Sequence, residues 1–336
     1  MNNIFVKMKN TIKKIFSGII YLPKKIYTLV DQIINDCITL RIKMKDLAKS
    51  NIDVGQYHLR NGNYNDAIFR FKLVDKFLDK NNIIANYYLG LAYFFKKDYQ
   101  NATTHLLKAE KKDKIGLLNF IKNIDNIESV PDKIYKLHRK NRAQFFVDKF
   151  ASEENNIPQN LIIEFNKAAS DLPAQYSILE IGSNIGLLGF EIAKRMQDEF
   201  IITATEISRE MINIQSVIYP DQQFYDEIYN DSAEAFIENN LQNFDVIFSL
   251  DGFSYIKNLR TILANIFSKL NNNGYFAFCV RTSNNPSFSY ELLEFSYNFE
   301  QLSADLREIG FKILSYKNFN LENKNNYTIL ICTKQI

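Results

Sequence analysis

The stretch Ile178–Ala193, ILEIGSNIGLLGFEIA, decides the fold. An apolar run that carries Glu180 leads into GSNIG at residues 182–186, and an amphipathic helix pattern starts directly afterwards. Gly182 and Gly186 let the backbone approach a ligand without a Cβ, and the Asn between them tolerates left-handed geometry better than most residues. The first amides of the helix then face an anionic or polar group. The stretch therefore predicts a strand, a tight turn and a helix N-terminus that together form a ligand site.

Beyond Tyr176, strand-like runs alternate with amphipathic helix patterns. The predicted strands cover 178–181, 201–206, 244–250 and 274–280, and the predicted helices cover 187–196, 208–217 and 259–270. Such alternation predicts βαβ units on a parallel sheet. A last helix over 300–309 stops at Gly310, a common helix-ending residue. Two more strand-like runs, 311–318 and 327–333, predict an antiparallel hairpin at the end of the chain.

The glycine spacing resembles motif I of the class I S-adenosylmethionine-dependent methyltransferases. Glu180, Gly182, Asn184 and Gly186 fit acid-x-Gly-x-Gly-x-Gly with one Asn substitution, whereas a dinucleotide loop needs G-x-G-x-x-G. A nicotinamide oxidoreductase is therefore disfavoured. The resemblance implies an α/β fold with a Rossmann-like, mostly parallel sheet, and S-adenosylmethionine as the cofactor.

Three further motifs match this family in order. TEISREMI resembles its acid-x-Ser-x-x-Met signature, which implies that Glu206 accepts the ribose hydroxyls, Ser208 caps a helix and Met211 lies near the adenine. Asp231, in NDSA, stands where the family presents an Asp and neighbouring amides to the adenine. Asp251, in FDVIFSLDGFSYI, lies past the fourth strand, where donor and acceptor meet.

The resemblance yields one candidate catalytic residue, Asp251, and no metal site. The cofactor-binding residues that it implies are Glu180, Gly182, Ser183, Asn184, Gly186, Glu206, Ile207, Met211, Asp231 and Ser232. Other roles stay open for three of these acids. Glu206 could be a solvated strand-end carboxylate, Asp231 could only cap the helix over 232–238, and Asp251 could only bind its own backbone.

The acceptor side is less defined. The Asn/Asp-Pro-Pro-Tyr signature for methylating amide or base nitrogens is absent, because SLDG occupies residues 249–252, which argues against DNA-adenine and glutamine methylation. Residues 281–298, with Pro286, Phe288, Tyr290 and Phe295, are the predicted acceptor wall. His138 is the one histidine that could fold over the donor as a general base, and a purely structural role is its alternative.

The chain before the sheet domain repeats itself. Gly55, Tyr64, Ala67 and Phe71 return 35 residues later as Gly90, Tyr99, Ala102 and Leu106. A repeat of this length indicates stacked helical hairpins and resembles the tetratricopeptide repeat, although the usual proline near each repeat's end is missing. Helices over 31–48 and 115–124 are expected to cap the stack. The resemblance implies docking of a peptide or protein partner; a hairpin pair that serves stability alone stays the alternative.

Together the two parts resemble a bacterial group of predicted tetratricopeptide-containing methyltransferases. That group tends to show L-F-D-x-Y-A ahead of the domain and Y-x-H before the last helix. This chain has LHRKNRA at 137–143 and YNF at 297–299 instead. The acceptor side therefore departs from the group, and a non-catalytic adaptor with a Rossmann-like domain that binds S-adenosylmethionine or is degenerate is the alternative function.

Composition and charge set the remaining expectations for this chain of 336 residues. With 46% hydrophobic and 24% charged residues, it is neither disordered nor fibrous. Residues 1–50 carry ten Lys and Arg against three acids, and the rest carries 31 against 35, which argues against a nucleic-acid partner. Four segments are predicted: a basic amphipathic helical segment (1–48), tetratricopeptide-like repeats (49–125), a helical connector or lid (126–175) and the methyltransferase domain (176–336).

The first thirty residues read as a basic amphipathic helix. Its longest uncharged run, residues 15–23, is too short to span a bilayer. It either lies on an anionic membrane surface, or it packs on the next domain or is left frayed. Cys37, Cys279 and Cys332 form no pairing pattern, which favours a reducing, cytoplasmic setting, and the last two are expected as buried thiols.

Overall fold

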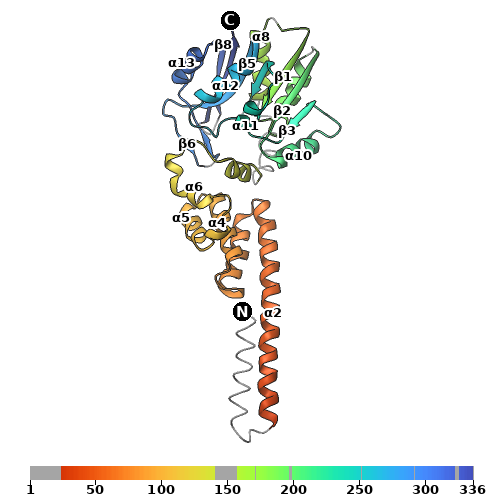
Figure 1. The fold of residues 1–336 in the computed structure, drawn as a ribbon, viewed down its shortest axis with the longest axis vertical. Coiled ribbons are helices and arrows are strands. Elements are labelled where there is room, and N and C mark those ends of the chain that lie inside the picture. The colour runs from red at the N-terminus through yellow and green to blue at the C-terminus, as the bar shows by residue number, and fades with distance from the viewer. Residues whose placement is uncertain are drawn as a thin grey trace.

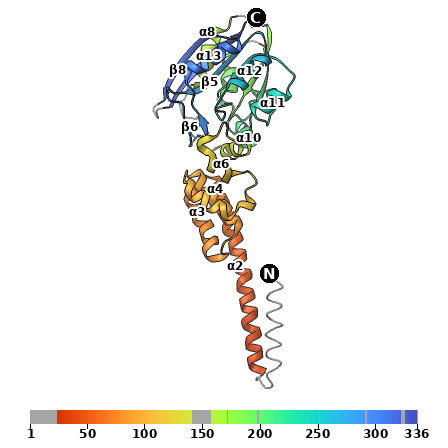
Figure 2. The ribbon, with the colours of Figure 1, turned by 60° about the vertical axis from the view of Figure 1, so that its left-hand side comes forward.

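The computed structural model describes residues 24–140, 157–170, 172–196, 199–250, 252–290, 292–321 and 325–335. A helical region comes first in the chain and a sheet domain follows it (Figure 1). Figures 1 and 2 show the sheet domain at one end of an elongated molecule and a long helix extending from the other. Asp251 and the basic segment up to residue 23 lie outside the described residues.

The sheet has seven strands in the order β3-β2-β1-β4-β5-β9-β8. Strands β1 to β5 are parallel, and β9 runs antiparallel to both β5 and β8. The prediction of a mostly parallel sheet with a C-terminal antiparallel hairpin is confirmed. The strands are β1 (Gln175–Ile181), β2 (Glu199–Thr205), β3 (Glu227–Tyr229), β4 (Phe244–Ser249), β5 (Leu270–Thr282), β8 (Phe311–Leu321) and β9 (Asn325–Lys334).

Helices cover both faces of this sheet. α8 (Ile157–Ala168) and α9 (Leu187–Arg195) share one apolar cluster with the strands. α11 (Ala233–Asn239), α12 (Arg260–Lys269) and α13 (Phe299–Ile309) share the other. α13 ends at Gly310, whose φ is 118°, as predicted. Cys279 and Cys332 are buried thiols in strands β5 and β9, also as predicted.

The helical region repeats one contact 35 residues apart. A Cβ on Gly55 would lie 2.5 Å from the Phe71 ring, and a Cβ on Gly90 would lie 2.5 Å from Cγ of Leu106. Both glycines therefore let a side chain of the next helix sit against helix backbone. The region comprises α2 (Lys24–Arg60), α3 (Tyr64–Leu73), the π-helical turn η1 (Val74–Leu78), α4 (Ile83–Phe95), α5 (Tyr99–Lys108), η2 (Glu110–Lys112), α6 (Leu117–Asn123) and η3 (Ile124–Asn126).

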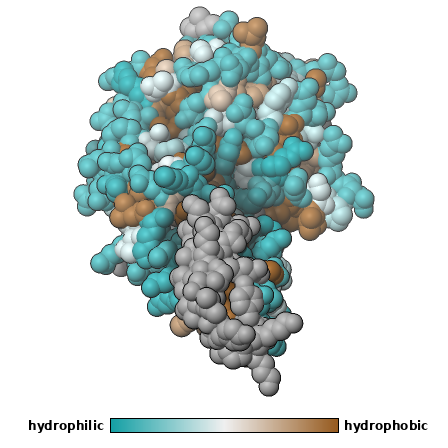
Figure 3. Space-filling view, turned by 60° about the horizontal axis from the view of Figure 1, so that its bottom comes forward, coloured by the Kyte–Doolittle hydropathy of each residue, from teal (hydrophilic) through white to brown (hydrophobic). Residues whose placement is uncertain are grey.

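The helix predicted over 31–48 is the N-terminal part of α2, which continues without a break through residues 48 and 49. α2 is 37 residues long, and its C-terminal half packs on α3 and α4. Within the described part of the chain, no helix is long and apolar enough to cross a membrane. On the side of the sheet domain that faces the viewer in Figure 3, hydrophilic side chains predominate, with separate hydrophobic patches between them.

Two segments join the helical region to the sheet domain. The amide of Val130 donates to the carbonyl oxygen of Tyr255 at 2.9 Å, and the amide of Lys257 donates to that of Glu128 at 2.8 Å. A short hairpin, β6 (Phe288–Ser289) and β7 (Glu294–Phe295), provides the second contact, where the Tyr99 hydroxyl donates to the carbonyl oxygen of Tyr290 at 3.2 Å. The loop after β4 is thus held from the helical side.

Candidate active site

The glycine loop lies at the carboxyl end of β1, where the strand order reverses. β1 pairs with β2 on one side and with β4 on the other. The loops that follow these strands therefore have a crevice between them, which is where α/β proteins bind ligands. Gly182, Asn184 and Gly186 have φ values of 76°, 54° and 83°, which confirms the predicted left-handed geometry. The amides of Gly182 and Ser183 donate to the carbonyl oxygen of Thr205 at 3.0 and 2.8 Å.

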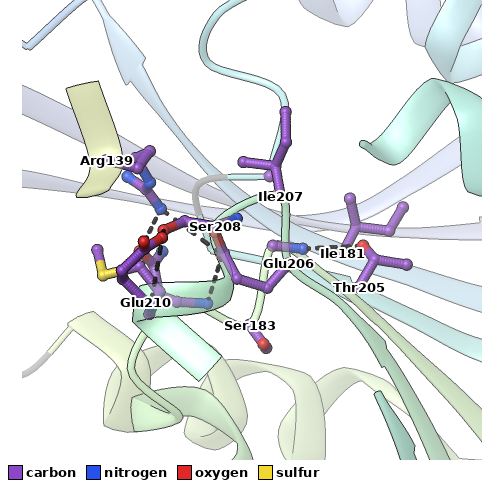
Figure 4. Close-up of polar contacts among 12 residues, drawn as sticks. Arg139, Ile181, Ser183, Thr205, Glu206, Ile207, Ser208 and Glu210 are labelled. Carbon is purple, nitrogen blue, oxygen red and sulfur yellow. Dashed lines mark hydrogen bonds and ion pairs between the residues drawn. The ribbon is translucent and has the colours of Figure 1, made fainter. Parts of the chain in front are cut away.

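Glu206 follows β2 directly and is 1% exposed. Its Oε2 accepts the amide proton of Asn184 and its Oε1 accepts that of Ser208, both at 2.9 Å. Asn230 donates its side-chain amide to the carbonyl oxygens of Glu206 and Ile207 at 2.8 and 3.0 Å. The carboxylate therefore joins the glycine loop to α10 (Arg209–Ile218) at the switch point (Figure 4). A solvated strand-end carboxylate, the alternative considered above, does not fit this burial.

Arg139 covers this carboxylate from the helical residues 132–140. It is 2% exposed, and its Nη2 lies 3.9 Å from Oε2 of Glu206. The same nitrogen donates to Oδ1 of Asn184, and the guanidinium lies 5.4 Å from the ring centroid of Tyr135. Figure 4 shows Arg139 pointing from its helix toward Glu206. A buried guanidinium needs such an opposite charge, because desolvation alone is costly.

The cavity beside Glu206 is small as a result. Its volume is about 10 Å³, about enough for one water molecule. A ligand as large as a nucleoside reaches Glu206 only if Arg139 moves. The cavity is lined by Tyr135, Arg139, Gly182, Thr205, Glu206, Ile207, Asp231, Ser232, Ala233, Gly252 and Tyr255.

Glu180 lies at the end of β1, fully buried beneath the loop. Burial raises its pKa to about 8, an effect that the hydrogen bond from Tyr225 at 2.9 Å partly offsets. Its other oxygen, Oε1, has no hydrogen-bond partner among the described residues. Burial and the nearby Glu180 also raise the pKa of Tyr225. Glu180 is therefore a protonated carboxyl group at neutral pH and supports the loop from below.

Ser232, and not Asp231, caps α11. The Ser232 hydroxyl accepts the amide of Ala235 at 3.4 Å, while Asp231 only accepts the amide of Ser232 at 3.0 Å. Asp231 is half-buried and lines the cavity beside Glu206. The alternative in which Asp231 serves merely as a helix cap is therefore wrong.

Tyr255 closes the cavity on the side of β4. It is buried, its ring centroid lies 4.7 Å from that of Tyr135, and its hydroxyl donates to Glu234. Burial and this carboxylate raise its pKa far above the usual range, so the hydroxyl stays protonated. Because its partners lie 21 and 120 residues away, spacing in the sequence gave no signal for it.

The structure brings together five of the predicted cofactor residues, namely Gly182, Glu206, Ile207, Asp231 and Ser232. The others support them from behind. The side-chain amide of Gln215 donates to Oγ of Ser183 at 3.0 Å and to the carbonyl oxygen of Asn184 at 2.8 Å. Met211 is buried beside Ile185. Ser208 caps α10 as expected. His138 is buried and does not line this cavity.

Sequence reasoning missed several lining residues, among them Arg139 and Gly252. A Cβ on Gly252 would lie 2.3 Å from the carbonyl oxygen of Ile181, so only glycine fits there without moving the end of β1. The signal for Gly252 was its place directly after the fourth strand. For Arg139 there was none, because its polar partners, Asn184 and Glu206, lie 45 and 67 residues away.

A larger cavity lies at the junction with the helical region, on the other side of the loop over 253–257. Its volume is about 730 Å³. Buried Phe295, Tyr297 and Leu302 form much of its apolar lining, and Tyr290, which donates to Asp125, bridges the two regions. The predicted acceptor wall thus borders a cavity that also includes residues 124–128 of the helical region. We call it the junction cavity.

Comparisons with known proteins agree with this geometry. Residues 179–276 match the family described as "Methyltransferase domain". No curated protein matches the chain. Among solved structures, the chain is similar to the Haemonchus contortus phospholethanolamine N-methyltransferase 2 in complex with phosphomonomethylethanolamine and S-adenosylhomocysteine. That match has a TM-score of 0.50 and 13% identity, and it covers 62% of this chain and 61% of that one.

Another solved structure, the magnesium protoporphyrin IX methyltransferase from Synechocystis with bound SAM, gives a TM-score of 0.46 at 11% identity and covers 62% of this chain and all of that one. The match to the Haemonchus enzyme spans about three fifths of the length of that enzyme. At 13% identity the match to the Haemonchus enzyme shows the fold of the sheet domain.

The described residues fit S-adenosylmethionine. A buried carboxylate ends β2, the Gly252 position has no room for a Cβ, and Asp231 and Ser232 line the same cavity. Part of the room needed for the ligand lies where the Arg139 side chain now stands. The sheet domain of this chain is accordingly a methyltransferase domain that uses S-adenosylmethionine as its cofactor.

Proposed function

We propose that this enzyme methylates an acceptor that is a protein or is carried by a protein, and that a segment of that protein next to the acceptor binds in the junction cavity. The helical repeats, which resemble tetratricopeptide repeats, would dock this substrate or a partner protein. The observation that carries the proposal is the shared lining of the junction cavity, to which both regions contribute. A ligand in it would touch both the repeats and the loop that follows β4.

The donor half of the reaction follows from the residues of the cavity beside Glu206. When bound, S-adenosylmethionine supplies an electrophilic methyl group for in-line displacement. Glu206 would accept its ribose hydroxyls, while Asp231 and the amides near Ser232 would contact the adenine. Holding the two reacting groups in line can lower the barrier by about 7 to 11 kcal/mol, so positioning is the main catalytic contribution of this chain.

The acceptor half rests on the size and lining of the junction cavity. Its volume of about 730 Å³ lies within the range of small-molecule pockets, about 300 to 1,000 Å³. Phe288, Phe295 and Tyr297 suit an aromatic, acyl or peptide side chain. The Tyr297 hydroxyl donates to the carbonyl oxygens of Phe253 at 3.3 Å and Ile256 at 2.7 Å, so the acceptor wall is tied to the loop that also carries Tyr255.

Two variants separate the two halves of the proposal. Glu206→Gln should abolish the rise in melting temperature on adding S-adenosylhomocysteine; for wild type this is about 5 to 10 °C at a hundredfold excess over Kd. Phe288→Ala should keep that rise but reduce transfer of labelled methyl groups to acid-precipitable, protease-sensitive material in a cell extract. Label that resists protease would exclude a protein acceptor.

A second candidate function, a non-catalytic adaptor, is favoured by one observation. Arg139 stands against Glu206 and leaves only about 10 Å³ beside it. An adaptor of this kind would neither show the rise in melting temperature nor transfer label to any extract. A donor-induced rise together with label transfer would exclude it.

A further inference from the structure

The N-terminal half of α2 extends beyond the region on which its C-terminal half packs. Among the described side chains of α2, from Leu29 onward, the buried apolar ones are Ala48, Ile52 and Leu59. Figures 1 and 2 both show the N-terminal half pointing away from the sheet domain. Because helices in proteins gain most of their stability from packing an apolar face, this half is expected to have a partner.

A line of apolar side chains follows this half at heptad spacing. Steps of three and four residues alternate along it, the pattern that keeps side chains on the inner line of a left-handed coiled coil. Ile33, Leu40 and Leu47 are 53%, 60% and 53% exposed, and they lie seven residues apart. The line spans about 27 Å at 1.5 Å per residue. We call it the α2 stripe: Val30, Ile33, Cys37, Leu40, Met44 and Leu47.

The residues beside the stripe suit pairing with an identical helix in parallel. With Cys37 at heptad position a, Asp36 is at g and Arg41 is at e. In a parallel pair, position g of one helix faces position e of the other helix five residues further on, so Asp36 would face Arg41 of the second copy on both sides. The equivalent residues one heptad earlier, Leu29 and Ile34, are both apolar and would widen the contact.

From this pattern we propose that the α2 stripe binds a second copy of this chain as a parallel, two-stranded coiled coil. Exposure of large aliphatic side chains at strict heptad intervals is unfavourable in water, and pairing removes these side chains from solvent. The two opposite-charge pairs between Asp36 and Arg41 favour the in-register arrangement. The proposal does not depend on the methyltransferase activity.

Light scattering of the full chain tests the proposal with a matched pair of variants. The wild type is expected at twice the chain mass of 39.3 kDa, and Leu40→Asp at 39.3 kDa. Ile42→Asp is the control, because Ile42 is 56% exposed but lies outside the α2 stripe, so this variant should remain a dimer. A monomeric wild type across a dilution series, or equal effects of the two variants, would overturn the proposal.

Cys37 reports the direction of the two helices. It is exposed and belongs to the α2 stripe, whereas Cys279 and Cys332 are buried. In a parallel pair it faces its own counterpart, so mild oxidation with diamide should give a covalent dimer that Cys37→Ser does not form. A dimer that never cross-links would overturn the parallel arrangement. A monomer that floats with phosphatidylglycerol vesicles only when Leu40 is intact would assign the stripe to a membrane surface instead.

Discussion

The sheet domain and the helical repeats use glycine for different purposes. At Gly252 an added Cβ would meet a backbone oxygen of Ile181, and Gly182 has a left-handed backbone; both positions shape the site. At Gly55 and Gly90 an added Cβ would meet a side chain of the neighbouring helix. Glycine thus fixes backbone geometry around a ligand in one region and close helix packing in the other. Substitutions in the two regions should therefore fail in different ways.

The largest expected effect is a loss of stability of the sheet domain at high pH, which Glu180 causes. The pKa of its carboxyl is about 8 in the folded chain and 4.5 when unfolded, so folding favours the protonated form. Its contribution to stability is complete below pH 4.5 and is lost as pH rises through 8, at about 1.4 kcal/mol per pH unit. Glu180→Gln cannot ionise, so the variant should exceed wild type by about 5 kcal/mol at pH 9.

Urea unfolding of both proteins between pH 5 and pH 9 measures this difference. Tyr225 can donate to the amide oxygen of the variant as it does to Glu180, so the fold should persist. A stability difference that does not change with pH would show that this carboxyl ionises freely in the folded chain.

The second effect separates a backbone clash from backbone strain. Gly252→Ala places Cβ 2.3 Å from the carbonyl oxygen of Ile181, which cannot move without shifting β1, and should cost about 3 kcal/mol. It should also remove the melting-temperature rise with S-adenosylhomocysteine. Gly62→Ala is the control, because φ is 73° there but nothing lies within 4 Å. It should cost about 1 kcal/mol and leave that rise intact.

The third effect tests whether the two helical hairpins are equivalent. Gly90→Ala drives a Cβ against Leu106 and should destabilise the chain by about 2 kcal/mol. Leu106→Ala removes the clash, so the double variant should be more stable than the sum of the single ones by about 1 kcal/mol. Urea unfolding measures this coupling. Gly55 and Phe71 should show coupling of the same sign, and coupling in only one of the two pairs would refute the equivalence.

The smallest expected effect is a change in the affinity of the donor site for S-adenosylhomocysteine. Removing the guanidinium with Arg139→Ala opens the space beside Glu206, so we expect S-adenosylhomocysteine to bind about tenfold more tightly, about 1.4 kcal/mol. Calorimetric titration measures the affinity. Lys140→Ala is the matched control, because Lys140 pairs with Glu210 at the surface of the same helix, at 2.6 Å. Weaker binding by the Arg139 variant would mean that the guanidinium helps to hold the ligand.

Most of the sheet domain could be predicted from the sequence, because its elements have strong local periodicity. Strands β1, β2, β4, β5, β8 and β9 and the helices between them lie where the apolar patterns placed them. β3 and the β6–β7 hairpin were missed, since two or three residues are too short to show a period. The break expected near residue 48 was not signalled by any helix-ending residue, and α2 continues there.

The sequence by itself determined the glycine loop with its left-handed Asn184, the acid after β2 and the 35-residue repeat. All of these depend on residues only a few positions apart, or on a repeated local pattern. Only the tertiary structure decided that Arg139 stands against Glu206, that Tyr255 closes the cavity and that the repeats border the predicted acceptor wall. The physical reason is that these contacts join residues 21 or more positions apart, and burial in three dimensions selects such partners without leaving a spacing in the chain.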